Sequence, residues 1–200
     1  MTGASDAATG ASDATTGASD AATGTGQAVT SLNSPAAADL AVIAAQLGRR
    51  PRAVLAIAHR CPCGLADVVE TAPRLPDGTP FPTLFYLTCP RAAAAMSRLE
   101  AAGVMRQMSA RLRSDPGLAA RYAAAHEDYL SRRAEAAARA GVEPLSPGAQ
   151  SAGGMPDRVK CLHALAAHAL AVPGVNPLGD EAVQAAGRWW EAGPCVNPDA

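Results

Sequence analysis

The sequence predicts an α+β fold, in which a small antiparallel sheet of about three strands packs with four to six helices. Three observations support this fold class. Short β-capable runs bounded by turn residues occupy 54–88, and apolar residues then recur with helical spacing from Arg91 onward. Aromatic residues make up only 4% of the chain, so we expect an aliphatic core, and abundant alanine favours close-packed helices.

The first 34 residues are predicted to be a disordered tail. Residues 2–22 contain three copies of a seven-residue unit, TGASDAA, TGASDAT and TGASDAA. A period of seven is typical of coiled coils, but the unit lacks a large aliphatic residue for a seam and contains a helix-weakening glycine. Such a segment cannot bury enough apolar surface to offset the entropy lost on ordering. We therefore expect one globular domain over 35–200.

The strands are expected to follow one N-terminal helix. That helix spans 36–47, after an Asn-Ser-Pro turn and before Gly48, a natural C-cap. The β-capable runs that come next are VLAIAHRC (54–61), VVET (68–71) and TLFYLT (83–88). A Pro-Cys-Gly turn joins the first two runs and a proline-rich loop leads into the third, which predicts an antiparallel meander.

Helical spacing fills the second half of the domain. An apolar face runs from Ala95 to Leu112, with an interruption at Gly103. Asp115 and the proline after it form an N-cap and first turn, so a helix is expected from there to about Arg139. Two more helices are expected, one over 156–171 and one that runs through Trp190.

Charge and hydropathy narrow the class of protein. The formal net charge is -1 and the pI is about 6.4, so no global basic field exists to bind nucleic acid. The longest uncharged apolar stretch, 161–175, falls short of the ~18 residues that a membrane span needs. The first residues lack the pattern of a secretory signal. We expect a cytoplasmic protein with unpaired thiols.

The cysteines form the first candidate site. Zinc and iron–sulfur sites need about four thiolates or imidazoles around one centre. The ends of the expected elements could bring four thiols together, so the predicted ligands are Cys61, Cys89, Cys161 and Cys195, with Cys63 or His163 as substitutes. On a regular helix, however, His163 would lie on a different face from Cys161. The alternatives are buried thiols that act as small hydrophobes, or a redox pair of Cys61 and Cys63.

The second candidate site is a Gly-Gly segment that leads into a helix. Gly153 and Gly154 would let backbone amides approach a ligand closely, and the helix start adds unpaired N–H groups. Arg158 and Lys160, which is the single lysine of the chain, could complete a phosphate or nucleotide site. The spacing is not that of a Walker motif. The alternative is an ordinary capped helix start with a solvated charged face.

Several segments resemble a known family. They are GRRPRAVLAIAHRCPCG (48–64), TAPRLPDGTPFPTLFYLTCP (71–90), SRLEAAGVM (97–105), AHEDYL (125–130), SAGGMPDRVKCLHALAAHALA (151–171) and VNPLGD (175–180). With these segments the domain resembles an uncharacterised actinobacterial family, domain of unknown function 501. The resemblance implies no activity, cofactor or catalytic residue. Members are often encoded beside a septum-formation-initiator-like protein and an exopolyphosphatase, which implies a protein partner in cell division.

Three functional hypotheses follow. The first is an intracellular protein with a cysteine-ligated zinc or iron–sulfur site of structural or regulatory role. The second is a phosphate- or nucleotide-binding enzyme that uses the Gly-Gly segment. The third is a protein-interaction module linked to cell division, which rests on the family resemblance alone.

Overall fold

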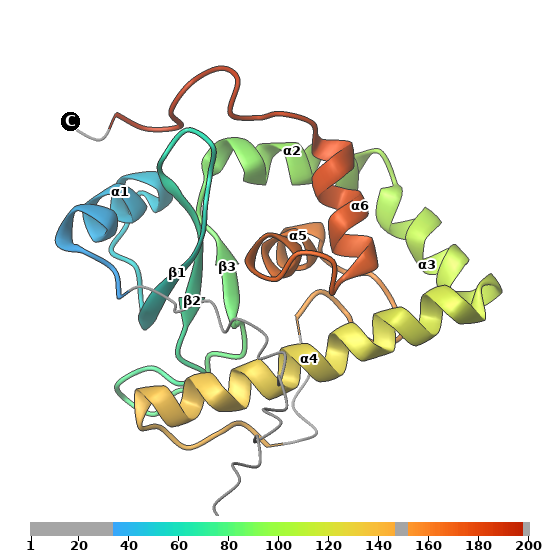
Figure 1. Cartoon of the computed structure of the whole chain (residues 1–200), viewed down its shortest axis with the longest axis horizontal. Helices are drawn as coiled ribbons and strands as arrows, with labels where there is room; N and C mark the ends of the chain where they lie inside the picture. Colours follow the sequence, from blue (N-terminus) through green and yellow to red (C-terminus); the bar gives the residue numbers. More distant parts are fainter. Residues whose placement is uncertain (1–33, 147–151, 198–200) are drawn as a thin grey trace, which may run out of the picture. The chain divides into compact units, whose positions relative to one another are not determined.

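The computed structural model describes residues 34–146 and 152–197. The repeats at 2–22, and the predicted disordered tail up to residue 33, lie outside the described residues, and the domain boundary near residue 35 stays a prediction. In the described part, six helices and one three-stranded sheet form the α+β fold that the sequence predicts (Figure 1). Their order is α1 (Ala37–Leu47), β1 (Val54–Arg60), β2 (Ala66–Thr71), β3 (Phe85–Leu87), α2 (Pro90–Ala101), α3 (Val104–Ser114), α4 (Pro116–Ala140), α5 (Leu162–Ala171) and α6 (Pro177–Ala186).

The sheet is an antiparallel meander in the order β1-β2-β3, as predicted. Its central strand, β2, is buried along its whole length because α1 contacts it from one side and α5 from the other (Figure 1). Successive side chains of a strand point to opposite faces. Val69 accordingly packs with Ile43 of α1. Val68 belongs to the larger apolar cluster that includes Leu162 and Leu165 of α5.

Local sequence signals set the ends of α2, α3 and α4. Gly103 separates α2 from α3 and has a φ of 82°, in the left-handed region that glycine tolerates best. The Asp115 carboxylate accepts a hydrogen bond from the Leu118 N–H at 2.9 Å, and Pro116 follows in the first turn. At the other end of α4, Gly141 has a φ of 64° and closes the helix.

The expected start of α5 at Pro156 is wrong, because the helix begins at Leu162. Residues 153–160 form a loop instead, closed by a hydrogen bond of 2.7 Å from the Lys160 N–H to the Gly153 carbonyl. The Leu162 N–H then donates to the Glu100 carboxylate at 2.7 Å. That cap comes from another helix, so no local signal marks it. The expected end of the last helix at Trp190 is also wrong, because Gly187, with a φ of 67°, follows α6 directly.

The core of the domain is built around α5, and α6 packs directly against this helix. At Gly179 of α6, a Cβ would lie 2.3 Å from the Leu165 carbonyl oxygen, so only glycine permits this close approach. His168 of α5 is fully buried, with both ring nitrogens bonded, and its ring stacks on Phe85 at 5.7 Å. Over the part of the chain that the structure describes, no helix is long and apolar enough to cross a membrane.

Candidate metal centre

Four of the five cysteines form two neighbouring pairs. Cys61 and Cys63 are neighbours at the turn between β1 and β2, and the thiol of Cys89, before α2, lies close to that of Cys195. Burial raises the pKa of Cys61 and of Cys89 to about 12, so both carry neutral thiols at neutral pH. Such thiols behave as small apolar side chains. Cys161 lies elsewhere, directly before α5.

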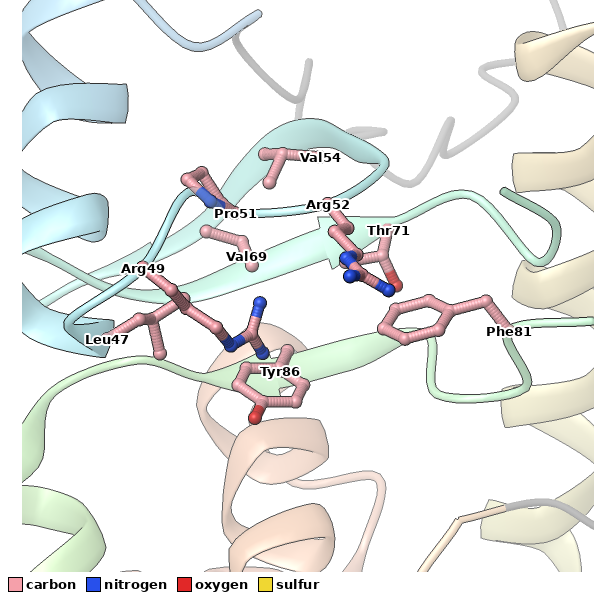
Figure 2. A pocket seen from close by; sticks show the side chains of 9 residues that line it. All are labelled: Leu47, Arg49, Pro51, Arg52, Val54, Val69, Thr71, Phe81 and Tyr86. Carbon is pink, nitrogen blue, oxygen red and sulfur yellow. The ribbon is translucent and has the colours of Figure 1, made fainter. Parts of the chain in front are cut away.

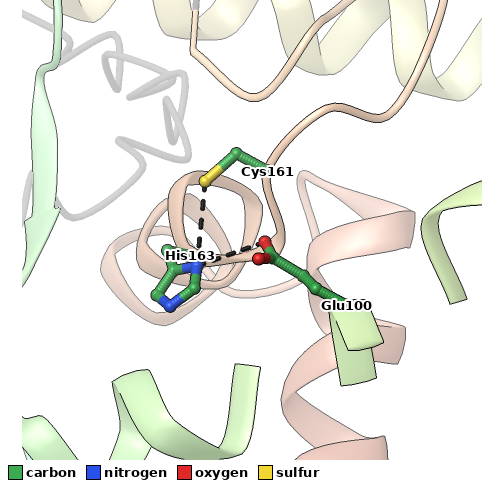
Figure 3. A group of neighbouring side chains, drawn as sticks. All are labelled: Glu100, Cys161 and His163. Atoms are coloured by element: carbon green, nitrogen blue, oxygen red, sulfur yellow. Dashed lines mark hydrogen bonds and ion pairs between the residues drawn. The ribbon is translucent and has the colours of Figure 1, made fainter. Parts of the chain in front are cut away.

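Cys161 is grouped with His163 and Glu100 (Figure 3). The His163 Nδ1 atom lies 3.8 Å from the Cys161 sulfur and 3.2 Å from the Glu100 Oε1 atom. One ligand atom from each side chain lies within 4.8 Å of the other two, and no second set of three potential ligands meets this limit among the described residues. The structure therefore brings Cys161 together with its predicted substitute ligand, His163. It does not gather the four predicted cysteines in such a set.

The backbone before α5 explains this grouping. Cys161 is the N-cap residue and has an extended conformation, with φ of −155° and ψ of 113°, whereas His163 lies in the first helical turn. The two side chains therefore do not follow the angular spacing of a regular helix. The expectation that they face different directions is wrong for this reason. Glu100, near the end of α2, completes the group because its carboxylate caps the first turn of α5.

The second ring nitrogen of His163 fixes the orientation of the imidazole. Nε2 lies 3.1 Å from the Ala93 carbonyl oxygen and 3.3 Å from the Ser97 hydroxyl. A carbonyl oxygen only accepts hydrogen bonds, so Nε2 carries a proton in this arrangement. Nδ1 then faces the sulfur and the carboxylate. Histidine ligands of metals are oriented in the same way, with the second N–H donated to a backbone carbonyl or a carboxylate.

Charge couples the three side chains. The hydrogen bond to Cys161, aided by the negative charge of Glu100, raises the pKa of His163 to about 9 against the opposing effect of burial. Burial also acts to raise the pKa of Cys161, but the hydrogen bonds from His163 and from the Ala164 N–H outweigh it and lower that pKa. This balance favours a thiolate, the form of cysteine that binds metals and attacks electrophiles.

The group borders a pocket of about 530 Å³ between α1, the β3–α2 segment and the start of α5. Cys161, His163 and Ala164 form one wall of it. The remaining lining residues are Gln46, Leu47, Thr83, Phe85, Tyr86, Leu87, Thr88, Pro90 and Ala93. The sulfur of Cys161 and the imidazole of His163 therefore border a largely apolar space that has the size of a small-molecule site.

Comparison with known proteins identifies the family. A family model described as "Protein of unknown function (DUF501)" matches residues 57–184, which include β2, β3 and every helix from α2 to α5. The chain belongs to the DUF501 family. No curated protein and no solved structure matches it. The matched region of this DUF501 protein contains Glu100, Cys161 and His163, whereas Cys195 lies beyond it.

The Gly-Gly segment of this DUF501 protein has internal partners. Gly153 and Gly154 have φ values of 71° and 94°, and a Cβ on Gly153 would lie 2.6 Å from the Leu165 side chain. The Lys160 N–H donates to the Gly153 carbonyl, and the Arg158 N–H donates to that of Gly154. These backbone groups are thus engaged within the protein, and the glycines serve packing. Anion binding by Gly153, Gly154, Arg158 and Lys160 stays a prediction.

Glu100 is the site residue that sequence reasoning missed. It is the single acidic residue in the α2 sequence PRAAAAMSRLEA, which is a faint signal in an otherwise apolar and basic helix. Its partners are 62 and 63 positions away in the chain, so spacing rules cannot connect them. Only the packing of α2 against α5 in this DUF501 protein brings its carboxylate to His163.

Proposed function

We propose that this protein binds a zinc ion through Cys161, His163 and Glu100, with one coordination position left open toward the adjoining pocket. The convergence of three different donor atoms carries the proposal: all lie within 4.8 Å of one another, and two of their separations fit tetrahedral zinc. Tetrahedral zinc, with bonds of about 2.3 Å to sulfur and about 2.0–2.2 Å to nitrogen and oxygen, separates S and N by about 3.6 Å and N and O by about 3.4 Å. The corresponding separations are 3.8 Å and 3.2 Å.

The donor set favours zinc over other metals and clusters. One thiolate, one imidazole and one carboxylate form a mixed set that suits a borderline cation, whereas magnesium and calcium prefer oxygen donors alone. An iron–sulfur cluster needs about four ligands, most of them thiolates. The group offers a single sulfur. Of the two cofactors that the sequence suggests, zinc is therefore the better fit.

The protein side of the site is prepared for a cation. Glu100 supplies a negative charge, Cys161 supplies a thiol whose pKa is lowered by the hydrogen bond from His163 although burial opposes this, and the proton on Nδ1 of His163 occupies the direction in which a metal would bind. Metal binding would displace this proton. Ala93 holds the opposite edge of the ring, and the Leu162 N–H holds the carboxylate. The imidazole of His163 and the carboxylate of Glu100 therefore do not have to be reoriented when a metal binds. This reduces the conformational entropy that is lost on binding.

The number of protein ligands indicates the kind of site. Structural zinc sites are closed by four protein ligands, whereas catalytic sites have three and keep a position for water or substrate. Here there are three, and two of them border the pocket of about 530 Å³. When bound at such an open site, zinc lowers the pKa of its water to about 7 and polarises carbonyl groups.

Zinc titration of chelator-treated, reduced protein against a chromophoric competitor tests this proposal. We expect one zinc per chain, with an affinity that falls by more than about 100-fold in Cys161→Ser and in His163→Ala, because even residues behind the ligands contribute about 10–100-fold. Two matched controls are available. Cys195→Ser removes another half-buried thiol, and His59→Ala removes another histidine that pairs with a carboxylate, that of Asp67 at 2.7 Å.

Both controls should bind zinc as tightly as the wild type does. Absence of zinc binding in the wild type would contradict the proposal, as would unchanged affinity in Cys161→Ser and His163→Ala. A loss of affinity in Cys195→Ser would instead support the four-cysteine site that the sequence suggests.

A further inference from the structure

A second pocket, separate from the metal group, lies beside the β1 end of the sheet (Figure 2). Its volume of about 280 Å³ is just below the about 300–1,000 Å³ typical of small-molecule sites. Val54, Val69 and Tyr86 contribute apolar surface from the three strands. Phe81 closes the side formed by the loop before β3. Its occupant would therefore be small and in contact with apolar surface.

Two arginines from the segment between α1 and β1 border this apolar space. Figure 2 shows the side chains of Arg49 and Arg52 extending toward the side of the pocket on which the rings of Tyr86 and Phe81 lie. Neither guanidinium forms an ion pair with a carboxylate in the described ranges. Asp77 interacts with Arg52 through charge, but its carboxylate accepts a hydrogen bond from the Thr79 N–H and not from the guanidinium. Arg49 donates to the Arg50 carbonyl at 3.3 Å. Two positive charges thus border one apolar pocket, and no carboxylate of the described residues forms an ion pair with either of them.

The backbone that presents Arg52 is held in an uncommon conformation. Ala53, the next residue, has a φ of 52°. Among the residues that the structure describes, 34–146 and 152–197, it is the single residue other than glycine with a positive φ. Its carbonyl accepts a hydrogen bond of 2.8 Å from the Ala72 N–H, which ties this bend to the chain beyond β2. Left-handed alanine costs free energy, and such strain concentrates at sites where a side chain must be aimed.

The aromatic side chains are the third observation. The whole chain has two phenylalanines and three tyrosines. One of each, Phe81 and Tyr86, is only partly buried, and both line this pocket. Exposed aromatic faces stack well on planar rings, and arginine forks bind phosphate and carboxylate groups through paired hydrogen bonds.

We infer that this pocket binds a small organic anion, in which a planar apolar ring carries a phosphate or carboxylate group. The ring lies against Tyr86 and Phe81, and the charged group is held by Arg49 and Arg52. Leu47 and Tyr86 line this pocket and also the pocket beside Cys161, so the two spaces share a boundary. The anion site uses none of the metal ligands and does not depend on zinc.

Isothermal titration calorimetry of the full chain with four matched probes tests this inference. The probes are 1-naphthyl phosphate, 1-naphthoate, the uncharged 1-naphthalenemethanol and inorganic phosphate. We expect at least one of the two aromatic anions to bind at one site per chain, at least tenfold more tightly than either the uncharged ring or phosphate alone. The better of the two anions identifies the charged group.

Variants locate the site. The double variant Arg49→Gln/Arg52→Gln should weaken binding of the preferred anion at least tenfold. Arg50→Gln is the matched control, because Arg50 is an exposed arginine of the same segment that does not line the pocket. It should bind like the wild type, as should His163→Ala, which separates this site from the zinc proposal. Equal weakening in the control and the double variant, or no binding of either aromatic anion at millimolar concentration, would overturn the inference.

Discussion

The Nδ1 atom of His163 lies 3.2 Å from the Oε1 atom of Glu100, although 63 positions separate the two residues in the chain. The same oxygen accepts a hydrogen bond from the Leu162 N–H at 2.7 Å. One carboxylate therefore caps the start of α5 and also supplies negative charge beside the imidazole. A single side chain thus contributes both to the start of the helix and to the chemistry of the site.

Replacement of Glu100 by glutamine should separate these two roles. Glutamine keeps an oxygen that can accept the Leu162 N–H but lacks the charge and is a poor zinc ligand. We expect Glu100→Gln to lower zinc affinity by more than about 100-fold, as for the other two ligands, because even residues behind the ligands contribute about 10–100-fold. We expect it to change the free energy of unfolding by less than about 1 kcal/mol. Glu100→Ala removes the cap as well and should cost a further ~1–2 kcal/mol, measured by urea unfolding. Equal stability of the two variants would contradict this division of roles.

Two glycines near helix starts should respond in opposite ways to the same substitution. Gly179→Ala would place a Cβ 2.3 Å from the Leu165 carbonyl oxygen and 2.9 Å from the Ala169 side chain. Overpacking of this kind costs about 1–3 kcal/mol, so the melting temperature should fall. Gly117 of α4 is the matched control, since a Cβ there would meet its nearest atom, an oxygen of Asp115, at 3.3 Å.

Gly117→Ala should leave stability unchanged or raise it by up to about 1 kcal/mol, because alanine is the better helix former. Thermal unfolding followed by circular dichroism measures both variants. A similar loss in both would mean that close packing between α5 and α6 is not what requires glycine at position 179.

The buried histidine of α5 should make stability depend on pH. Asn176 donates to Nδ1 of His168 at 3.3 Å, so Nε2 carries the proton and donates to Asp128 at 3.2 Å. Burial lowers the pKa of His168, outweighing the hydrogen bond and charge of Asp128, while Arg132 and Asp180 act on it with opposite signs. The unfolded state therefore binds more protons than the folded state just below the unfolded pKa of about 6.5.

The resulting stability is present above pH ~6.5 and is lost as the pH falls below it, with a slope of at most about 1.4 kcal/mol per pH unit for one proton. Urea unfolding of zinc-free wild type and His168→Gln between about pH 5 and 6.5, above the range where most carboxylates titrate, measures this contribution as a difference. Other groups, among them His163 with its raised pKa, contribute to both proteins, so the slope should be less positive in His168→Gln than in the wild type. An equally steep slope in that variant would assign the effect to another group.

Much of the fold follows from local sequence signals. Asp115 and Pro116 mark the start of α4, Gly48 closes α1, and turn residues delimit the three strands. These features depend on each residue and its immediate neighbours, so the sequence predicts them correctly. The sheet order follows because short connections favour antiparallel neighbours.

The candidate site could be predicted only in part, because its geometry arises from long-range packing. Cys161 and His163 are both candidates from their chemistry, yet helical spacing assigns them to different faces. Their approach depends on the start of α5 at Leu162, which the Glu100 carboxylate caps from α2. The contact between Cys89 and Cys195 likewise depends on the path of the C-terminal segment. The spacing of residues along the sequence does not predict such long-range contacts.

X-ray absorption at the zinc edge tests the central claim most directly, because it counts the sulfur atoms bound to the metal. For zinc-loaded wild-type protein we predict one sulfur and a remainder of nitrogen and oxygen neighbours, with the sulfur contribution lost in Cys161→Ser. Two or more sulfur neighbours would contradict the account. So would a sulfur signal that survives in Cys161→Ser and disappears in Cys61→Ser or Cys89→Ser.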